Sequence, residues 1–252
     1  MIAALLVVLV LAVVLGHLLA AWFSARRTGL PPEQSLHLAV RVGGVLALLL
    51  LLSVAASVSG LIDNFDSNPP YLMRFLLPHI VFALIIGSVS PYGRRLALGL
   101  PVAVLVGLQA FRIPVELLLH GLYSDGIAPV QVTYLGWNFD IVTGLTAIPV
   151  AWLAARGKAS RTLLIAWNTL GLATLGNIVI VALTSMPGPS RLFMNEPSAR
   201  FITSLPYIFI PTLFVTTALL GHVLLFRRLR IEAKSGELRH VHAGGAPALV
   251  DR

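Results

Sequence analysis

Residues 1–27 read MIAALLVVLVLAVVLGHLLAAWFSARR, a long apolar run that ends at the pair Arg26 and Arg27. A helix that crosses a lipid bilayer needs roughly 20 mainly apolar residues, so this stretch has the length and composition of a membrane span. A cleaved secretory signal peptide would carry basic residues before a shorter apolar run, whereas here the basic residues follow it. The stretch therefore predicts a retained first membrane helix whose N-terminus lies outside.

The same pattern recurs along the chain and predicts an all-α, polytopic membrane bundle. Of the 252 residues, 57% are hydrophobic and 11% are charged, and the mean hydropathy is +0.89. A soluble domain carries about 25% charged residues, so lipid is the expected solvent for most of this surface. Seven transmembrane helices are predicted, at residues 2–23, 36–59, 73–92, 96–120, 138–156, 162–185 and 204–226.

These helices form one predicted transmembrane domain over residues 1–228. Residues 229–252 mix charged residues with Gly, Pro and Ala, and they are predicted to be a disordered cytoplasmic tail. Pro206 and Pro211 lie in the outer half of the last predicted helix and should distort it, because proline lacks the amide N–H that an α-helix uses.

The net charge of +8 is distributed as a topology signal. Basic residues gather at the ends of apolar runs, at residues 26–27, 94–95, 156–161 and 227–230. Connections that stay in the cytoplasm retain Lys and Arg, and an outside N-terminus places all four groups on that side. We therefore expect the C-terminus in the cytoplasm, the lipid bilayer as the main partner, and no nucleic-acid partner.

Several classes of activity lack the residues they need. The chain has no cysteine, which excludes disulfides, thiolate metal sites and a cysteine nucleophile. It contains no H-E-x-x-H, G-x-S-x-G or phosphate-loop motif, and residues 204–226 hold no lysine for a retinal Schiff base. The sequence therefore predicts no cofactor and no metal site, and it leaves open whether the protein is an enzyme.

The most informative segment is Arg112-Ile-Pro-Val-Glu116-Leu-Leu-Leu-His120, at the end of the fourth predicted helix. Positions i, i+4 and i+8 share one helix face, so these three polar residues should form a stripe that rises towards the outer surface. The fifth predicted helix begins with Asn138 and Asp140. We expect Glu116 and Asp140 at similar depths, with Arg112 about one turn deeper and within reach of both carboxylates.

Two interpretations of this cluster stand side by side. Each charge in hydrocarbon costs about 2–3 kcal/mol unless it is paired or hydrated, so an intramembrane cluster indicates a functional site. In that interpretation Arg112 anchors a ligand or ion, Glu116 and Asp140 accept it, Asn138 donates and His120 is a pH-responsive gate. In the other, Arg112 and Asp140 only hold two helices together, and Glu116 and His120 are wetted near the headgroups.

Other intramembrane polar residues give weaker signals. His79, in the third predicted helix, and Asn177, in the sixth, are possible additional members of the site, although Asn177, like Asn168, fits interhelical packing better. A metal or haem site could draw on residues predicted near the cytoplasmic ends of helices, but interfacial snorkelling is the preferred interpretation for them. These residues are His17, His37, Arg41 and His222.

The polar segments also resemble a known family. The resemblance is carried by Phe111-Arg112-Ile113-Pro114-Val115-Glu116, by Pro129, Thr133, Gly136, Asn138-Phe139-Asp140 and Gly144, and by Trp167-Asn168, Asn177, Pro206, Pro211 and His222. Over residues 70–228 the chain is similar to uncharacterised bacterial multi-pass integral membrane proteins with no established activity. The resemblance implies a location in the bacterial cytoplasmic (inner) membrane and adds no function.

Three functions remain open on these grounds. The leading hypothesis is an outward-facing pocket between the fourth, fifth and seventh predicted helices that binds a small polar ligand, ion or proton for transport or sensing. The second is a membrane-embedded enzyme that acts on lipid or isoprenoid, with the carboxylates and histidine as general acid and base. The third is a non-catalytic subunit of a membrane complex, and the oligomeric state is open.

Overall fold

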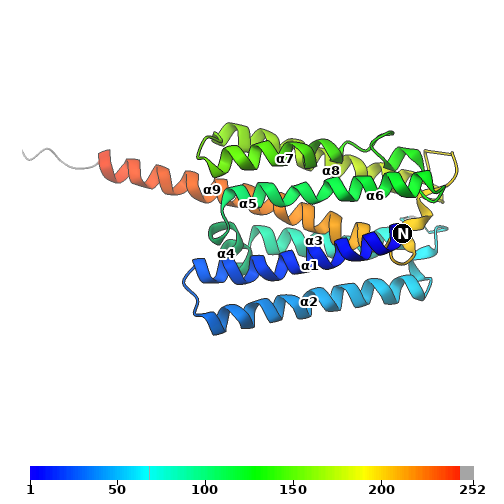
Figure 1. Cartoon of the computed structure of the whole chain (residues 1–252), viewed down its shortest axis with the longest axis horizontal. Helices are drawn as coiled ribbons and strands as arrows, with labels where there is room; N and C mark the ends of the chain where they lie inside the picture. Colours follow the sequence, from blue (N-terminus) through cyan, green and yellow to red (C-terminus); the bar gives the residue numbers. More distant parts are fainter. Residues whose placement is uncertain (68, 245–252) are drawn as a thin grey trace, which may run out of the picture.

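The computed structural model describes residues 1–67 and 69–244, and in these residues all the regular structure is helical. Figure 1 shows the long helices lying side by side along one direction. The α-helices are α1 (Ile2–Arg27), α2 (Pro32–Val58), α3 (Tyr71–Ser88), α4 (Pro91–Gly99), α5 (Val102–Gly107), α6 (Arg112–Ser124), α7 (Asp140–Ala155), α8 (Arg161–Thr184) and α9 (Thr216–Gly244). Short 3-10 helices lie at Leu61–Asp63 (η1), Leu108–Phe111 (η2), Val130–Val132 (η3) and Ala199–Thr203 (η4), and a π-helical turn, η5, spans Ile210–Val215.

Most of these helices have the length and apolar character of membrane spans. Among the described residues, six helical segments qualify: Ile2–Arg27, Pro32–Val58, Tyr71–Ser88, Val102–Ser124, Arg161–Thr184 and Ile210–Ser235. A helix needs roughly 20 apolar residues to cross the hydrocarbon core. The protein therefore has the architecture of an all-α, multi-pass membrane protein, while α7 is an apolar helix of only 16 residues.

The connection between the third and fourth predicted helices is itself helical. The sequence places a helix end at 92 and a helix start at 96, but residues 91–99 form α4. Ser90 caps this helix by accepting a hydrogen bond from the Gly93 amide at 2.9 Å, and Pro91 occupies its first turn. Pro101 then forces Leu100 into an extended conformation, and for that reason α4 and α5 are separate helices.

Non-helical backbone replaces the predicted outer ends of two helices. The helix expected from 138 begins at Asp140, and the preceding residues 130–133 pack as a short turn whose Gln131 and Val132 are buried. The helix expected from 204 begins only at Ile210, where the π-helical turn η5 leads into α9. Pro206 and Pro211 account for this irregular start, as predicted.

The last helix continues beyond the predicted transmembrane domain. α9 runs to Gly244, so residues 229–244 are helical where a disordered tail is predicted. Arg228 explains part of this difference, because it pairs with Glu232 one turn later at 2.5 Å and also donates to the carbonyls of Ala97 and Leu98 in α4. The rest of the predicted tail, residues 245–252, lies outside the described residues.

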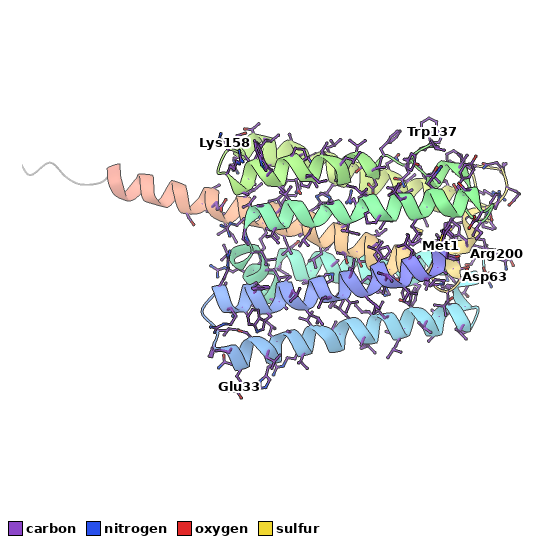
Figure 2. The ribbon with its side chains drawn as sticks, in the orientation of Figure 1. Met1, Glu33, Asp63, Trp137, Lys158 and Arg200 are labelled. Carbon is purple, nitrogen blue, oxygen red and sulfur yellow. The ribbon has the colours of Figure 1, made fainter. Side chains whose placement is uncertain are left out.

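The basic groups gather at one end of the bundle. Figure 2 shows Glu33 and Lys158 at this end and Met1, Asp63 and Arg200 at the other. Hydrogen bonds tie the basic end together, since Arg95 donates to Thr28 at 2.7 Å and Arg227 donates to the Ser90 carbonyl at 2.8 Å. The bundle thus has a basic end, with the connections that follow α1, α3 and α7, and an opposite end that carries the N-terminus.

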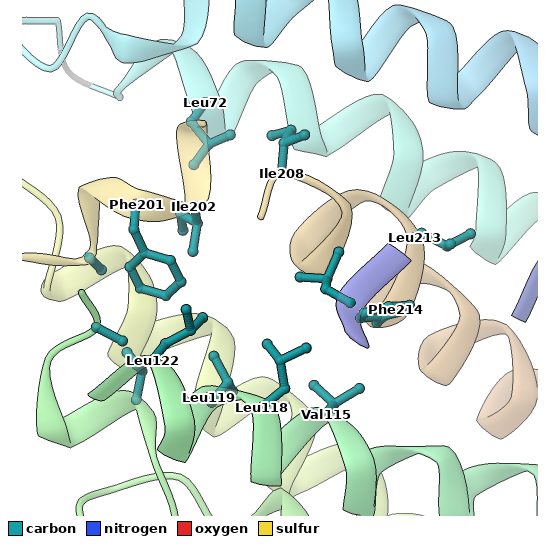
Figure 3. Packing of buried hydrophobic residues seen from close by; sticks show 14 of the residues in the cluster. Leu72, Val115, Leu118, Leu119, Leu122, Phe201, Ile202, Ile208, Leu213 and Phe214 are labelled. Carbon is teal, nitrogen blue, oxygen red and sulfur yellow. The ribbon is translucent and has the colours of Figure 1, made fainter. Parts of the chain in front are cut away.

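The largest apolar core lies towards the N-terminal end. Figure 3 shows Leu118, Leu119 and Leu122 of α6 facing Leu72 of α3 and side chains from the segment 201–214. A second cluster around Val106, Trp167 and Leu225 lies nearer the basic end. The polar residues described below occupy the region between these two clusters, so their surroundings are apolar on both sides.

Near the N-terminal end, an ion pair joins η1 to η4. Asp63 accepts hydrogen bonds from the Arg200 guanidinium and, at 2.9 Å, from the Thr203 hydroxyl. The hydrogen bond from Arg200 holds the pKa of Asp63 below its ordinary value. A carboxyl whose pKa is lowered by folding stabilises the fold above its unfolded pKa, and this contribution is lost as the pH falls through the folded value.

We therefore expect Asp63→Asn to lower the stability at neutral pH by no more than about 1 kcal/mol, because the pair is partly exposed. The difference from the parent protein should shrink as the pH falls below about 4, where the carboxyl is increasingly protonated. Thermal unfolding of both proteins in detergent across this pH range measures the difference. The exposed neighbour Asp66 supplies the control, since Asp66→Asn removes a carboxylate outside the pair. An equal effect of both substitutions would contradict the assignment.

Candidate functional site

Arg112 lies near the middle of a continuous helical segment formed by α5, η2 and α6. The segment runs from Val102 to Ser124, and Arg112 is ten residues from one end and twelve from the other. At about 1.5 Å per residue, the guanidinium-bearing residue is ~15 Å and ~18 Å from the two ends. The side chain is only 2% exposed. A buried charge at this depth requires partners, because an unpaired one costs several kcal/mol.

Three other helices provide these partners. Arg112 Nη1 donates to Asp140 Oδ1 of α7 at 3.0 Å, and it also faces the Gly171 carbonyl at 3.2 Å and Thr174 Oγ1 at 3.4 Å in α8. Arg112 Nη2 lies 2.9 Å from His222 Nε2 of α9. Asp140 is in the first turn of α7, where the helix dipole favours a negative charge. The salt bridge is therefore stabilised at the guanidinium by groups of α8 and α9, and at the carboxylate by the helix dipole of α7.

The arginine also determines the tautomer of His222. A guanidinium can only donate hydrogen bonds, so Nε2 of a neutral His222 must accept and the ring proton must be on Nδ1. That proton is donated to Asn168 Oδ1 at 2.7 Å, and Asn168 Nδ2 donates in turn to the His222 carbonyl at 3.0 Å. Gly171 permits this contact, since a Cβ there would lie 2.3 Å from His222 Cε1. We call Arg112, Asp140, Asn168, Thr174 and His222 the Arg112 network.

Glu116 lies one helical turn from Arg112 and belongs to a separate pair. Both of its carboxyl oxygens accept from Asn138 Nδ2, at 2.7 and 2.8 Å, and the same amide donates to the Val132 carbonyl at 2.9 Å. Asn138 Oδ1 accepts from the Asp140 amide at 3.0 Å, so one asparagine connects Glu116 to the start of α7. Glu116 and Asn138 are 2% and 1% exposed.

The structure thus brings together four of the five main predicted residues, namely Arg112, Glu116, Asn138 and Asp140. Of the two carboxylates predicted within reach of Arg112, only Asp140 forms a salt bridge with it, and the second guanidinium nitrogen faces His222. Since α7 starts only at Asp140, Asn138 faces Glu116 and Asp140 faces Arg112, one turn deeper.

The remaining predicted residues lie at the edge of the site or outside it. His120 is half-buried, and its ring centroid is 4.9 Å from that of Tyr134. Asn177 donates to the Trp137 carbonyl, next to Asn138, which agrees with a packing role. His79 faces the Phe75 carbonyl at 3.0 Å and lines a cavity with His17 and Thr216, away from the network.

His222 is the important residue that sequence reasoning placed wrongly. It is expected near the cytoplasmic interface, yet it is fully buried against Arg112. The error follows from the helix bounds: if α9 ended near 226, His222 would be in its last turn, but the helix continues for several more turns. Asn168 had a visible signal as an asparagine in an apolar helix, whereas Thr174 had none, because threonine is common in membrane helices.

The charges of the buried site residues determine which of them can change state. Arg112 and Asp140 neutralise each other, and His222 accepts from the guanidinium as a neutral imidazole. Glu116 has only the neutral Asn138 beside it, so its charge has to be balanced by a bound proton or a small cation. Glu116 is therefore the group in this site whose state can change without breaking the salt bridge.

The comparison with known proteins covers the segment that holds the site. A family model described as a domain of unknown function (DUF8737) matches residues 70–230, from the residue before α3 into α9. The chain belongs to this family. The matched segment includes the Arg112 network and the Glu116–Asn138 pair, and it excludes α1 and α2. No curated protein and no solved structure matches the chain.

Breaking the buried salt bridge should destabilise the bundle strongly. We expect Asp140→Ala to lower the free energy of unfolding by about 3–5 kcal/mol, since it leaves the Arg112 charge buried without a counter-ion. Adding Arg112→Met to this variant removes the unpaired charge and should recover most of the loss. Unfolding in mixed micelles with increasing denaturing detergent measures both values. If the double variant is less stable than Asp140→Ala, the pair is not the source of the effect.

Proposed function

We propose that the protein crosses the bacterial cytoplasmic (inner) membrane seven times, with the N-terminus outside and the C-terminus in the cytoplasm. α7 supplies the seventh crossing, with the turn at 130–133 and Asn138 filling the outer level above its first residue. Non-helical backbone is tolerated at membrane depth where protein covers it, and Gln131, Val132 and Thr133 are buried. The basic end of the bundle supports the orientation, because cytoplasmic connections carry the excess of Lys and Arg.

The absence of cysteine from the sequence makes this topology directly testable. We expect Asp125→Cys, in the connection after α6, to react with a membrane-impermeant maleimide in intact cells. Lys158→Cys, in the connection between α7 and α8, should react only after the membrane is permeabilised. The cysteine-free parent is the control for background labelling. The reverse pattern of labelling would invert the proposed orientation.

Within this topology, we infer that the Glu116 carboxyl reversibly binds a proton or a small cation, in a transport or sensing role. One observation carries the proposal: Glu116 is 2% exposed and its side chain faces an amide, whereas the nearby guanidinium is committed to Asp140 and His222. Such a carboxyl is neutral overall only when it carries a proton or a cation. Gain or loss of that partner would change the force that Glu116 exerts on Asn138.

The route to Glu116 would lead from the outer side, between α6, α7 and α9. His120 is one turn above Glu116 and its ring lies beside Tyr134, on the connection that also carries Asn138. Because the site residues are buried in this arrangement, an outward-facing pocket requires that connection to move. His120 would then serve as a pH-responsive gate, and Arg112 as the fixed cation that keeps a second cation from going deeper.

Infrared difference spectroscopy on the reconstituted protein tests this proposal. A pH step should produce a carbonyl-stretch band of a protonated buried carboxyl, and Glu116→Gln should abolish that band while the protein stays folded. Asp125→Asn is the matched control, because it removes a carboxylate in the exposed connection after α6. Repeating the step with and without sodium separates a proton from a cation.

A band that persists unchanged in Glu116→Gln would overturn the proposal. So would the absence of any pH-dependent or sodium-dependent signal that depends on Glu116. In either case the Arg112 network would be a structural feature that holds α6, α7, α8 and α9 together.

A further inference from the structure

A second site lies on the opposite side of α9 from the Arg112 network. A cavity of about 180 Å³ separates α1 from η2, α5 and α9. Helix α1 packs on α4 at the basic end and on α6 at the other, and the cavity lies between these two contacts. Leu108 is part of its wall and is 47% exposed, so the cavity lies at the lipid-facing surface of the bundle.

The lining of this cavity selects for a neutral, mainly apolar molecule. Its residues are mainly Leu, Ala, Val and Gly, and the polar members are His17, Gln109 and Thr217. They include no Asp, Glu, Lys or Arg, so a charged headgroup would find no counter-ion here. A cavity of 150 Å³ lined by apolar side chains holds a benzene-sized group, so this one accommodates roughly the first seven or eight heavy atoms of a longer chain.

Gln109 gives the cavity a specific polar feature. Its side chain is 1% exposed, and Nε2 donates to the Ala218 carbonyl at 3.1 Å. A carbonyl can only accept, so the amide nitrogen must be the atom on that side and Oε1 must face the other way. Oε1 is buried with no hydrogen-bond partner. A buried acceptor without a partner is unfavourable, and a donating ligand would remove that cost.

A second cavity adjoins this one, and a side chain in its lining also has an unpartnered hydrogen-bond acceptor. It has a volume of about 70 Å³ and shares His17, Thr217 and Leu220 with the first, so the hydrogen bond of 2.9 Å between His17 and Thr217 lies at their boundary. His79 lines it with Nε2 buried and unpartnered, while Nδ1 faces the Phe75 carbonyl. A neutral ring that donates from Nδ1 leaves Nε2 as an acceptor.

We propose that the cavity between α1, η2 and α9 binds a neutral lipid alcohol, whose hydroxyl donates a hydrogen bond to Gln109 Oε1 and whose hydrocarbon chain leaves past Leu108. The unpartnered atoms belong to side chains that line the two cavities, and both are acceptors, so a ligand that satisfies either of them after a small side-chain rotation has to donate. A quinone or an ester offers only acceptors at its polar end, and a phospholipid brings a charge. An isoprenoid or fatty alcohol meets each requirement, and it reaches the cavity from the bilayer.

This inference is independent of the proposal for Glu116, because it uses residues on the other face of α9 and a helix outside the matched family segment. Gly221 sets the geometry of the Gln109 side chain against α9. A Cβ at Gly221 would lie 2.3 Å from Gln109 Nε2, so the glycine lets the amide lie flat against α9. Gly16, across the cavity on α1, has no atom within 4 Å of an added Cβ. A larger side chain at position 16 therefore fills the cavity without disturbing the helix backbone.

Photolabelling of the full chain in nanodiscs tests the proposal. The probe is a farnesol analogue that carries a diazirine on its first isoprene unit, and labelled peptides are mapped by mass spectrometry. We expect adducts on α1, η2 and α9, and we expect farnesol to compete at least about fivefold better than farnesyl methyl ether, which cannot donate a hydrogen bond. Gln109→Leu should remove this difference between the two competitors.

A matched pair of glycine variants provides the control. Gly16→Leu should reduce specific labelling at least about tenfold, because its side chain occupies the cavity. Gly176→Leu places the same side chain at another helical glycine with open space, outside both cavities, and should leave labelling unchanged. Equal labelling of Gly16→Leu and the parent protein would overturn the proposal. Equal competition by alcohol and ether in the parent would show that the cavity holds hydrocarbon without recognising a hydroxyl, and would overturn it as well.

Discussion

The guanidinium of Arg112, in the middle of an apolar bundle, is the constraint on which the rest of the structure depends. A charge at that depth costs several kcal/mol without partners, and the chain draws those partners from α7, α8 and α9. Each partner fixes the height and rotation of its helix: Asp140 places the first turn of α7, Gly171 and Thr174 place α8, and His222 places α9. Apolar side chains alone would tolerate sliding or rotation of these helices, because lipid and protein interior are equally apolar. One polar centre therefore gives the bundle its register.

The same constraint explains why α7 is short and why Glu116 is distinct. Asp140 can reach Arg112 only if α7 begins at mid-bundle, so the residues that precede it fill the rest of that half of the bundle without a helix. Asn138 satisfies that irregular backbone by bonding to Val132 and to the start of α7, and Glu116 completes its hydrogen bonds. Glu116 thus supports a segment that is held by hydrogen bonds rather than by a salt bridge. A change in its charge acts on that segment first, while the Arg112 network stays intact.

The sequence could predict the parts of this structure that depend on local pattern. Hydropathy located the helices to within a few residues in α1, α2 and α8, and the i, i+4 spacing identified Arg112 and Glu116 as neighbours. It could not predict that α9 continues to Gly244, and that single difference moved His222 from an expected interface into the core. Nor could it assign partners, since both carboxylates were within reach of Arg112 by spacing alone. The pairing is decided by where α7 starts, which depends on the buried turn at 130–133 and on tertiary packing.

Close contacts at two glycines, one in α8 and one in α9, connect both candidate sites to α9. Gly171 of α8 admits the His222 ring on one side of α9, and Gly221, the residue immediately before His222, admits the Gln109 amide on the other. Because His222 and Gly221 are adjacent, a rotation or shift of α9 that lengthens the contact of His222 with Arg112 must also move the backbone against Gln109. A packed interface of this kind has little room for continuous adjustment, so it passes small displacements on rather than absorbing them. The close approach of α9 to both neighbours therefore ties the position of the Gln109 amide to that of the His222 ring.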